Sequence, residues 1–525
     1  MRVVTSSQMK WLEKQCIEEI GLPGVILMEN AALALKEQCL AFLANCASKD
    51  GSDLKRARVI IVAGTGGNGG DGLALARHLH VSKVDTRVLL VGDAGGMRGD
   101  TKLNLDIARR LGIKIDTMPI GDGSIDVPYA LEGADLVVDA LFGIGLDRRV
   151  EGSFEYVIDM MNTYGKYIIS VDIPSGVNAD TGHVMGKAVM ARKTVTFGYP
   201  KPGMLLYPGA AFAGEVITAN ICLPSSSEID SESRIIIYTD EEIPSLLPKR
   251  GARSNKGTYG RILGFAGSAG MPGAAVLSAE AAYRAGAGYV CAAVTSHVGA
   301  IIQNNLREAV SLIVPDRNGM FSHRSMDAAQ DEMERASVIY IGPGLGRAQH
   351  VTEFVDAVIE AAHVPLVMDA DALNAVSENV NILKKVQSPC VITPHPGEMS
   401  RLTGLSIKDI MDNAVQVAQE FAREFDVIVC LKDARSVCAN ADGDVYINVT
   451  GDTTLAKAGS GDILTGLIAG LLAQRCEPFV AASLGMYLHG KAGEFAGHEL
   501  SHRGALASDV LRHIPDVLKS YESLA

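Results

Sequence analysis

The chain has 525 residues, of which 47% are apolar and 21% charged, so it contains enough apolar side chains to bury a large core. A single core stops growing near roughly 250 to 300 residues, so we expect two or more domains. The 48 basic and 61 acidic residues give a formal charge of −13, which argues against a surface that binds nucleic acid. The 55 glycines show no collagen-like period, so we expect them in turns and phosphate-binding loops.

The N-terminal segment and the cysteines indicate a cytoplasmic protein. Residues 1–19 become charged without a long apolar stretch or a cleavage site, so no export signal is expected. The longest apolar stretch, near residues 464–472, is shorter than the roughly 20 residues of a membrane span and contains two glycines. The nine cysteines are odd in number and include no C-x-x-C pair, which favours reduced thiols over a disulfide framework.

Short β-branched runs alternate with amphipathic stretches, a pattern typical of α/β layers with mainly parallel strands. In the first half of the chain the predicted strands are 59–62, 88–91, 136–138 and 168–171. A segment rich in serine and acidic residues interrupts the pattern at 224–234, and we place the domain boundary there. Strands resume at 261–265, 338–341, 366–368, 391–392 and 427–429. We therefore predict two α/β domains, residues 1–225 and residues 235–525.

A glycine-rich loop follows the first predicted strand, with the sequence GTGGNGGDG at residues 64–72. It contains G-x-G-x-x-G between a predicted strand and a predicted helix, which alone is a weak indication of a dinucleotide-binding fold. Asn68 and Asp71 add an amide and a carboxylate that this fingerprint does not require. These two side chains indicate polar contacts to a ligand or a cation.

Two later strands end in acidic residues, Asp139 and Asp172. Because ligands bind outside the carboxyl ends of parallel strands, the loops that follow these strands can converge on one crevice. The alternative is that each aspartate only caps a turn or a helix, and for either residue alone the two interpretations are about equally supported.

The segments GTGGNGGDG, ADLVVDALFGIG and SVDIPSGVNADTG closely resemble the epimerase domain of the bifunctional NAD(P)H-hydrate repair enzymes, over roughly residues 1–220. The resemblance implies a Rossmann-like three-layer domain that binds a damaged dinucleotide as its substrate. The implied substrate contacts are Gly67, Asn68, Gly69, Gly70, Asp71, Gly143, Ile144, Gly145, Leu146, Asp147, Arg148, Arg149 and Asp172. It further implies that K+ is coordinated by Asn68, Asp139 and Ser175.

Epimerising the hydrated carbon requires proton transfers that a positioned carboxylate can assist, so Asp172 is the candidate catalytic acid or base of this domain. Members of the family usually have two adjacent asparagines in the first loop, whereas this chain has Gly67 before Asn68. One side-chain hydrogen bond is therefore expected to be missing at the substrate.

In the second domain, the sequence LAKAGSGDILTG at residues 455–466 runs into an apolar helix. Its small residues let backbone N–H groups approach a phosphate at the helix N-terminus, and Asp462 lies where a catalytic base would face that phosphate. The alternative is an ordinary helix start with a favourable acidic residue. No G-x-x-x-x-G-K-[ST] motif occurs, so a P-loop is excluded.

This constellation is typical of the ribokinase-like superfamily. The segments GSAGMPGAA, IGPGLG, MDADALN and TPHPGE narrow the resemblance to NAD(P)H-hydrate dehydratase, over about residues 245–520, so a ribokinase-like three-layer α/β domain is expected. The implied contacts to the hydrated dinucleotide are Ala274, Gly344, His395 and Asp462. The implied contacts to the nucleotide donor are Lys432, Asp433, Ala434, Arg435, Ser436 and Gly461.

Two of these positions need comment. His395 alone would be interpreted as a turn histidine, but two flanking prolines and Gly397 hold it on a rigid turn, which favours a role in the site. Family members usually have Lys-Gly where this chain has Lys432-Asp433, so a negative charge lies beside the expected nucleotide site.

The resemblance implies that the hydroxyl on C6 of the S hydrate is phosphorylated by ADP, with Mg²⁺, and that phosphate elimination then restores NADH or NADPH. The epimerase domain would supply the S hydrate from the R hydrate. An NAD-dependent dehydrogenase would explain the first loop but not the GSGD segment. A ribokinase-like small-molecule kinase fused to a dinucleotide-binding domain would leave a stable phosphorylated product. A non-catalytic nucleotide sensor is disfavoured by the acidic residues at both sites. We expect homo-oligomers, with no nucleic-acid or membrane partner.

Overall fold

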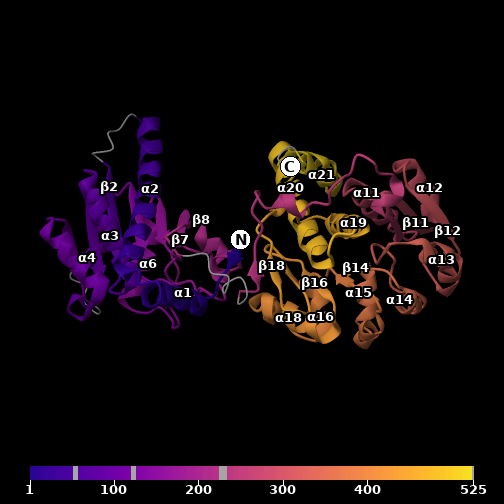
Figure 1. The fold of residues 1–525 in the computed structure, drawn as a ribbon, viewed down its shortest axis with the longest axis horizontal. Helices are drawn as coiled ribbons and strands as arrows, with labels where there is room; N and C mark the ends of the chain where they lie inside the picture. Colours follow the sequence, from indigo (N-terminus) through magenta and orange to yellow (C-terminus); the bar gives the residue numbers. More distant parts are fainter. Residues whose placement is uncertain (51–56, 120–125, 224–232, 523–525) are drawn as a thin grey trace. The chain divides into compact units, whose positions relative to one another are not determined.

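The computed structural model describes residues 1–50, 57–119, 126–223 and 233–522. Its contacts divide the chain into two compact units, Arg2–Ser233 and Arg234–Ala525, with Met1 grouped with the second unit (Figure 1). The boundary predicted at 224–234 lies almost entirely outside the described residues.

The N-terminal unit contains a parallel sheet in the order β4-β3-β2-β5-β6-β7-β8. The strands of the unit are β1 (Arg2–Val3), β2 (Arg58–Ala63), β3 (Asp85–Val91), β4 (Lys114–Met118), β5 (Leu136–Ala140), β6 (Ile168–Val171), β7 (Lys193–Phe197) and β8 (Glu215–Ala219). Its helices are α1 (Ser6–Glu18), α2 (Gly24–Asp50), α3 (Gly67–Val81), η2 (Ala94–Gly96), α4 (Gly99–Arg110), α5 (Val127–Leu131), α6 (Ser153–Tyr164), α7 (Pro202–Leu205) and α8 (Ala210–Ala213).

Helices cover both faces of this sheet, because successive side chains of a strand point to opposite faces. On β2, Val59 and Ile61 pack in one apolar core with α1, α2, α3 and α4. Ile60 and Val62 pack in a second core with α5 and α6. A strand buried on both faces has no polar alternation, which explains the continuous apolar run in its sequence.

The C-terminal unit contains a larger sheet in which the strands run in the order β9-β18-β17-β16-β15-β14-β13-β10-β11-β12. Pairing is parallel from β16 to β12 and antiparallel on either side of β17. The strands are β9 (Ile235–Ile236), β10 (Arg261–Phe265), β11 (Tyr289–Thr295), β12 (Val310–Val314), β13 (Val338–Ile341), β14 (Leu366–Met368), β15 (Cys390–Ile392), β16 (Ile428–Leu431), β17 (Val437–Ala439) and β18 (Val445–Ile447).

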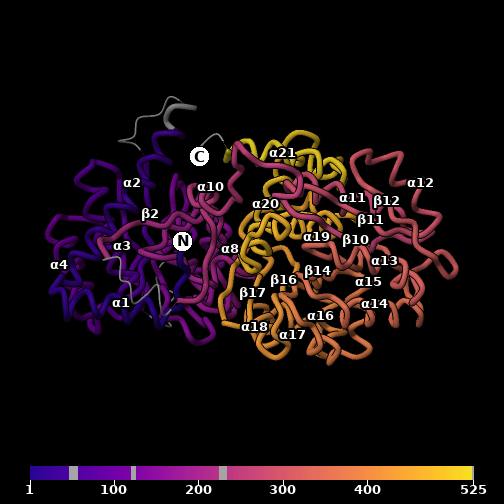
Figure 2. Tube along the Cα trace, turned by 45° about the vertical axis from the view of Figure 1, so that its right-hand side comes forward, coloured from indigo at the N-terminus to yellow at the C-terminus, as the bar shows by residue number. Residues whose placement is uncertain are grey.

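Helices again cover both faces. The helices are α10 (Ile243–Leu246), η3 (Lys256–Tyr259), α11 (Pro272–Arg284), α12 (Ser296–Asn305), α13 (His323–Arg335), α14 (Gln349–Ala361), α15 (Asp371–Val376), η4 (Val380–Lys385), α16 (Pro396–Thr403), α17 (Ile407–Asp412), α18 (Ala414–Phe425), η5 (Thr453–Leu455), α19 (Ser460–Ala473), α20 (Pro478–Leu500) and α21 (Ala507–Glu522). Helices α20 and α21 lie on one side of the strands and α16 and α18 on the other (Figures 1 and 2). On β10, Ile262 faces the core that contains α11, α19, α20 and α21, whereas Phe265 contacts Phe354 of α14.

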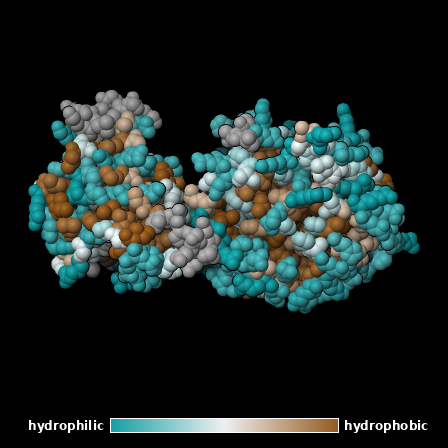
Figure 3. All heavy atoms as spheres, in the orientation of Figure 1, coloured by the Kyte–Doolittle hydropathy of each residue, from teal (hydrophilic) through white to brown (hydrophobic). Residues whose placement is uncertain are grey.

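The predicted α/β class with mainly parallel sheets is therefore confirmed for both units. Each strand predicted from an apolar run is present, with ends shifted by at most a few residues. Within the described ranges, no helix is long and apolar enough to cross a membrane. The face drawn in Figure 3 is a mixture of hydrophilic surface and apolar patches.

Candidate active sites

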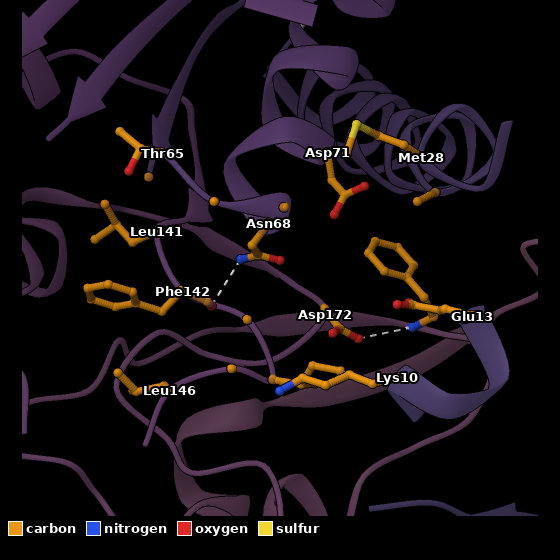
Figure 4. A pocket seen from close by; sticks show the side chains of 18 of the residues that line it. Lys10, Glu13, Met28, Thr65, Asn68, Asp71, Leu141, Phe142, Leu146 and Asp172 are labelled. Carbon is orange, nitrogen blue, oxygen red and sulfur yellow. Dashed lines mark hydrogen bonds between the residues drawn. The ribbon is translucent and has the colours of Figure 1, made fainter. Parts of the chain in front are cut away.

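The N-terminal sheet has a switch point between β2 and β5. The chain continues from β2 to β3 on one side, and β5 lies on the other side of β2. The loops after these two strands therefore diverge and leave room for a ligand at the carboxyl edge of the sheet. A cavity of about 600 Å³ lies there, lined by both loops, by α1 and α2, and by Asp172 (Figure 4).

The glycine-rich loop divides into cavity-lining and packing residues. Gly67, Asn68 and Asp71, in the first turns of α3, line the cavity. Gly69 and Gly70 do not line it and are buried. A Cβ on Gly69 would lie 1.8 Å from the carbonyl oxygen of Gly64, and one on Gly70 would lie 2.6 Å from Met28 Cε. These two glycines let α3 start tightly against the strand and α2, so that the N–H groups of its first turn face the cavity.

The loop after β5 supplies the facing wall. Gly143, Ile144, Gly145, Leu146, Asp147 and Arg148 all line the cavity. Arg149 does not; it is exposed and lies 3.9 Å from Glu151. The two loops contact one another, since Asn68 Nδ2 donates a hydrogen bond of 3.0 Å to the Phe142 carbonyl oxygen.

Asn68 and Ser175 lie beside this same carbonyl, and Asp139 is hydrogen-bonded to Ser175. Ser175 Oγ lies 3.3 Å from the Phe142 carbonyl oxygen and 2.5 Å from Asp139 Oδ1. Asp139 is fully buried at the end of β5 and also accepts hydrogen bonds from Ser170 Oγ and the Ser175 backbone N–H, each at 2.8 Å. Burial raises the pKa of Asp139, and the hydrogen bonds from Ser175 and Ser170 oppose this shift. The loops thus bring together a carboxylate, a hydroxyl, an amide and a carbonyl.

Asp172 lies directly after β6 with a φ of 63°, a backbone conformation that costs a non-glycine residue about 1 kcal/mol or more. Its Oδ1 accepts hydrogen bonds from Lys201 Nζ at 2.6 Å, Thr196 Oγ1 at 3.0 Å and the Phe197 N–H at 3.3 Å. The surrounding residues therefore hold this carboxylate in one place despite the strained backbone. Figure 4 shows Asp71 pointing toward Asp172 across the cavity, whereas the amide of Asn68 is turned toward the Phe142 carbonyl.

Two further carboxyl groups line the cavity, Asp71 from α3 and Glu13 from α1. Burial, with the charges of Asp172 and Glu13, raises the pKa of Asp71 well above its usual range. Burial and the charge of Asp172 also raise the pKa of Glu13. Carboxyl groups with a raised pKa that face a cavity are typical of acid-base sites.

In the C-terminal unit the glycine-rich segment starts α19. Gly459, with a φ of 92°, precedes the first residue of the helix, Ser460, and Asp462 lies in the first turn. Burial, together with the charge of Asp369, raises the pKa of Asp462 to about 6. A carboxyl with this pKa is ionised at pH 7 and still basic enough to accept a proton efficiently.

A buried ion pair lies beside this helix start. Asp369, after β14, accepts hydrogen bonds from Lys432 Nζ at 2.7 Å and from Thr465 Oγ1 at 3.0 Å. Burial raises the pKa of Asp369, but the charge and hydrogen bond of Lys432, together with hydrogen bonds from the Thr393 and Thr465 hydroxyls, outweigh burial and hold the pKa below its usual value. A Cβ on Gly461 would lie 3.2 Å from Asp369 Oδ2 and 3.3 Å from Lys432 Nζ, so this glycine allows α19 to start against the ion pair.

His395 is the N-cap of α16. Its Nδ1 accepts hydrogen bonds from the Gly397 and Glu398 N–H groups at 3.0 and 3.3 Å, and Glu398 accepts one from the His395 N–H. Because Nδ1 is an acceptor, Nε2 carries the proton in the neutral ring. Burial lowers the pKa of His395, which favours that neutral form.

The remaining predicted residues lie at neighbouring strand ends. A Cβ on Gly344 would lie 2.9 Å from Ala274 Cβ, so the loop after β13 contacts the start of α11. The segment from Lys432 to Ser436 joins β16 to β17, and Ser436 Oγ accepts a hydrogen bond from the Asp433 N–H. Within it, Arg435 Nη1 donates a 2.6 Å hydrogen bond to the Val449 carbonyl oxygen.

Comparison with known proteins shows that proteins of one family contain both units in a single chain. The family described as YjeF-related protein N-terminus matches residues 24–203, and the family described as NAD(P)H-hydrate dehydratase matches residues 262–516. The Bifunctional NAD(P)H-hydrate repair enzyme Nnr of Moorella thermoacetica is 39% identical over 99% of this chain and 97% of that protein. The chain belongs to the family of bifunctional NAD(P)H-hydrate repair enzymes.

Further similar proteins match most of this chain or about half of it. The repair enzyme Nnr of Escherichia coli is 31% identical over 86% of this chain and 83% of that protein. A solved structure of the ADP/ATP-dependent NAD(P)H-hydrate dehydratase from Bacillus subtilis, co-crystallized with ATP/Mg²⁺, is 34% identical, with a TM-score of 0.47 over 54% of this chain and 98% of that chain. A ribokinase-like superfamily protein from Enterococcus faecalis is 24% identical, with a TM-score of 0.48 over 55% of this chain and 96% of that one.

Several residues of this repair-enzyme chain were not assigned a role from the sequence. Lys201 contacts Asp172 from a segment between β7 and α7, and the only local signal is its place between two prolines, Pro200 and Pro202. Asp369 occurs in the quoted MDADALN segment, but its pairing with Lys432 depends on the fold. His489 is buried on α20 and lies 3.2 Å from Ser460 Oγ; burial lowers its pKa to about 4.

Proposed function

We propose that the N-terminal unit interconverts the R and S hydrates of NADH and NADPH, and that the C-terminal unit dehydrates the S hydrate with ADP as the phosphoryl donor. As a member of its family, the chain is a repair enzyme with an isomerase and a lyase activity. The observation that carries the residue assignments is that one chain holds two different acid-base sites. Asp172 faces a cavity at a switch point, and Asp462 lies at a glycine-rich helix start.

In the first site, the hydrated dinucleotide binds between the two loops, against Gly67, Asn68 and Asp71 on one side and residues 143–148 on the other. The free N–H groups at the start of α3 receive its phosphates. Asp172 serves as the acid or base that transfers the protons needed to invert C6. The positions of Gly69, Gly70 and Arg149 outside the cavity lining favour a packing role for the two glycines and an indirect role for the arginine.

K+ is proposed to be held by Asn68, Asp139 and Ser175. Asn68 and Ser175 lie at the Phe142 carbonyl, and Asp139 accepts a hydrogen bond from Ser175. This arrangement supports the proposal, because a hard cation prefers oxygen ligands and a single carboxylate matches a monovalent charge. Bound there, K+ would supply a fixed positive charge at the edge of the cavity.

In the second site, Asp462 accepts the proton of the hydroxyl on C6 as that oxygen attacks the β-phosphorus of ADP. The new P–O bond replaces the bond to AMP, which leaves, and the N–H groups at the start of α19 stabilise charge on the transferring phosphoryl group. Loss of phosphate from C6 and of a proton from C5 then restores the nicotinamide double bond. Mg²⁺, when bound, would neutralise charge on the donor phosphates.

The remaining assignments divide between the two ligands of this site. Ala274, Gly344 and His395 contact the hydrated dinucleotide, and His395 can donate only from Nε2, because Nδ1 is used as a helix cap. Lys432 to Ser436 and Gly461 hold the donor nucleotide. Lys432 is already paired with Asp369, so it is fixed in position before the nucleotide arrives.

The test is to incubate the purified chain with a mixture of R and S hydrates of NADH, with ADP or ATP, and to follow the absorbance of regenerated NADH. Full recovery is expected. No recovery with either donor would contradict the dehydratase assignment, and recovery that stops at the S fraction would contradict the epimerase assignment.

A further inference from the structure

Three carboxyl groups line the first cavity, those of Glu13, Asp71 and Asp172. Asp172 differs from the other two because it pairs with a buried lysine, Lys201. The Lys201 side chain has no exposed surface, and its Nζ donates to Asp172 Oδ1 at 2.6 Å. The same Nζ also donates to Thr196 Oγ1 at 2.9 Å and to the Phe197 carbonyl oxygen at 3.1 Å. Three acceptors thus use the three N–H bonds of the ammonium, which leaves none for substrate.

The hydrogen bonds described above for Asp172 are all accepted by one of its two carboxylate oxygens. Lys201, Thr196 and the Phe197 N–H all donate to Oδ1, and among the described residues none is recorded as donating to Oδ2. Asp172 itself lines the cavity. One carboxylate oxygen is therefore held by the protein, and the other remains available to a bound ligand.

The other two carboxyl groups lack such a partner. Within the described part of the chain, neither Asp71 nor Glu13 has a recorded ion pair or side-chain hydrogen bond. Burial raises the pKa of both groups, and the charges of Lys201 and, for Glu13, Lys10 only oppose the shift. Among these three carboxyl groups, only Asp172 has a lysine partner within the described residues.

We propose that Lys201 is the positioning residue of the epimerase site: it holds Oδ1 of the base Asp172 in place and leaves Oδ2 free for the substrate. The inference rests on the proposed role of Asp172. Lys201 itself contacts no substrate atom; it acts only through Asp172. If Lys201 only stabilised the fold, its replacement would instead lower the activity by the same factor at every pH.

The test uses the full chain with the R hydrate of NADH and measures kcat and KM of epimerisation as a function of pH. Lys201→Met should lower kcat about 100-fold at pH 7, change KM less than about threefold, and move the acidic limb of the pH profile up by about one unit or more, because Asp172 loses its counter-ion. Lys193→Met is the matched control: Lys193 lies on β7, pairs with Glu215 at 3.3 Å and does not line the cavity. It should leave the profile unchanged.

A double variant separates the possible failures. If Lys201 acts through Asp172, then Asp172→Asn with Lys201→Met should be no slower than Asp172→Asn alone. Additive losses, or an unshifted pH profile in Lys201→Met, would overturn the inference. If Asp172→Asn alone retains epimerisation, the proposed role of Asp172 fails instead. Circular dichroism checks folding, and if Lys201→Met does not fold, Lys201→Gln, which keeps an N–H donor without the charge, should show the same pH shift.

Discussion

Replacing Asp462 with asparagine should abolish NADH recovery and, at the same time, stabilise the folded chain at neutral pH. The gain in stability is expected because burial and the charge of Asp369 raise the pKa of this carboxyl from 3.8 to about 6. The folded state binds the proton more tightly than the unfolded state, so ionised Asp462 costs stability. This cost is absent below about pH 4, grows as the pH rises to about 6 and is constant above. A shift of about 2 pKa units corresponds to at most about 3 kcal/mol at pH 7.

The rate of NADH recovery is expected to fall, although the folded chain becomes more stable. Asparagine cannot accept the hydroxyl proton, so recovery of NADH from the S hydrate with ADP should fall by a factor of about 10²–10⁴. In the unsubstituted chain the same step should weaken below about pH 6, as Asp462 becomes protonated. Interconversion of the R and S hydrates should remain, because Asp172 is in the other unit.

The measurements are NADH absorbance with S hydrate and ADP, and the free energy of unfolding of the C-terminal unit in urea at pH 7 and at pH 4. Asp331→Asn, an exposed aspartate on α13, removes the same charge from the same unit away from the site. Retained NADH recovery in Asp462→Asn would refute its role as the base. A stability gain equal at both pH values would refute the argument from burial.

Three further outcomes are expected. Replacing KCl with choline chloride should slow epimerisation and leave the rate of dehydration unchanged. In Asp139→Asn, epimerisation should proceed at the same rate in both salts. Equal epimerisation rates in both salts for the unsubstituted chain would contradict the proposed K+ site. Gly67→Asn should fold normally, because a Cβ there meets nothing within 4 Å, and should lower the KM for the R hydrate severalfold; a raised KM would contradict the placement of Gly67 at the substrate. Asp433→Gly should lower the KM for ADP about threefold to tenfold in low salt, because it removes a negative charge beside the nucleotide. The control Glu334→Gln on α13 should leave this KM unchanged. An unchanged KM in Asp433→Gly would indicate that the nucleotide binds elsewhere.

The strands that were predicted could be recognised because they are almost entirely buried on both faces, which leaves an uninterrupted apolar run in the sequence. Partly exposed strands such as β4 and β12 lack such a run and were not predicted. The convergence of the loops at 64–72 and 141–148 also followed from the sequence, since ligands in parallel sheets bind at strand ends. The different roles of the individual glycines could not be predicted from the sequence. Gly67 and Gly69 are two residues apart, yet one faces the cavity and the other is pressed against the carbonyl of Gly64, and only the path of the backbone separates these roles.

The pairing of a lysine with an aspartate was the part of each site least accessible to sequence reasoning. Lys201 is 29 residues from Asp172, and Lys432 is 63 residues from Asp369. In both cases the aspartate follows one parallel strand and the lysine follows a later one, so the pair forms only when the sheet has assembled. No local periodicity carries that information.

The two ion pairs also explain how a chain with a formal charge of −13 can hold anionic dinucleotides. At each site a lysine is already paired with an aspartate, Lys201 with Asp172 and Lys432 with Asp369. On the proposed assignments, the phosphates would be bound by the N–H groups at the starts of α3 and α19, which act as fixed dipoles, and in the first cavity also by Arg148. The glycines allow the backbone to come close enough for this contact. The lysines, in turn, hold the Asp172 and Asp369 carboxylates in place.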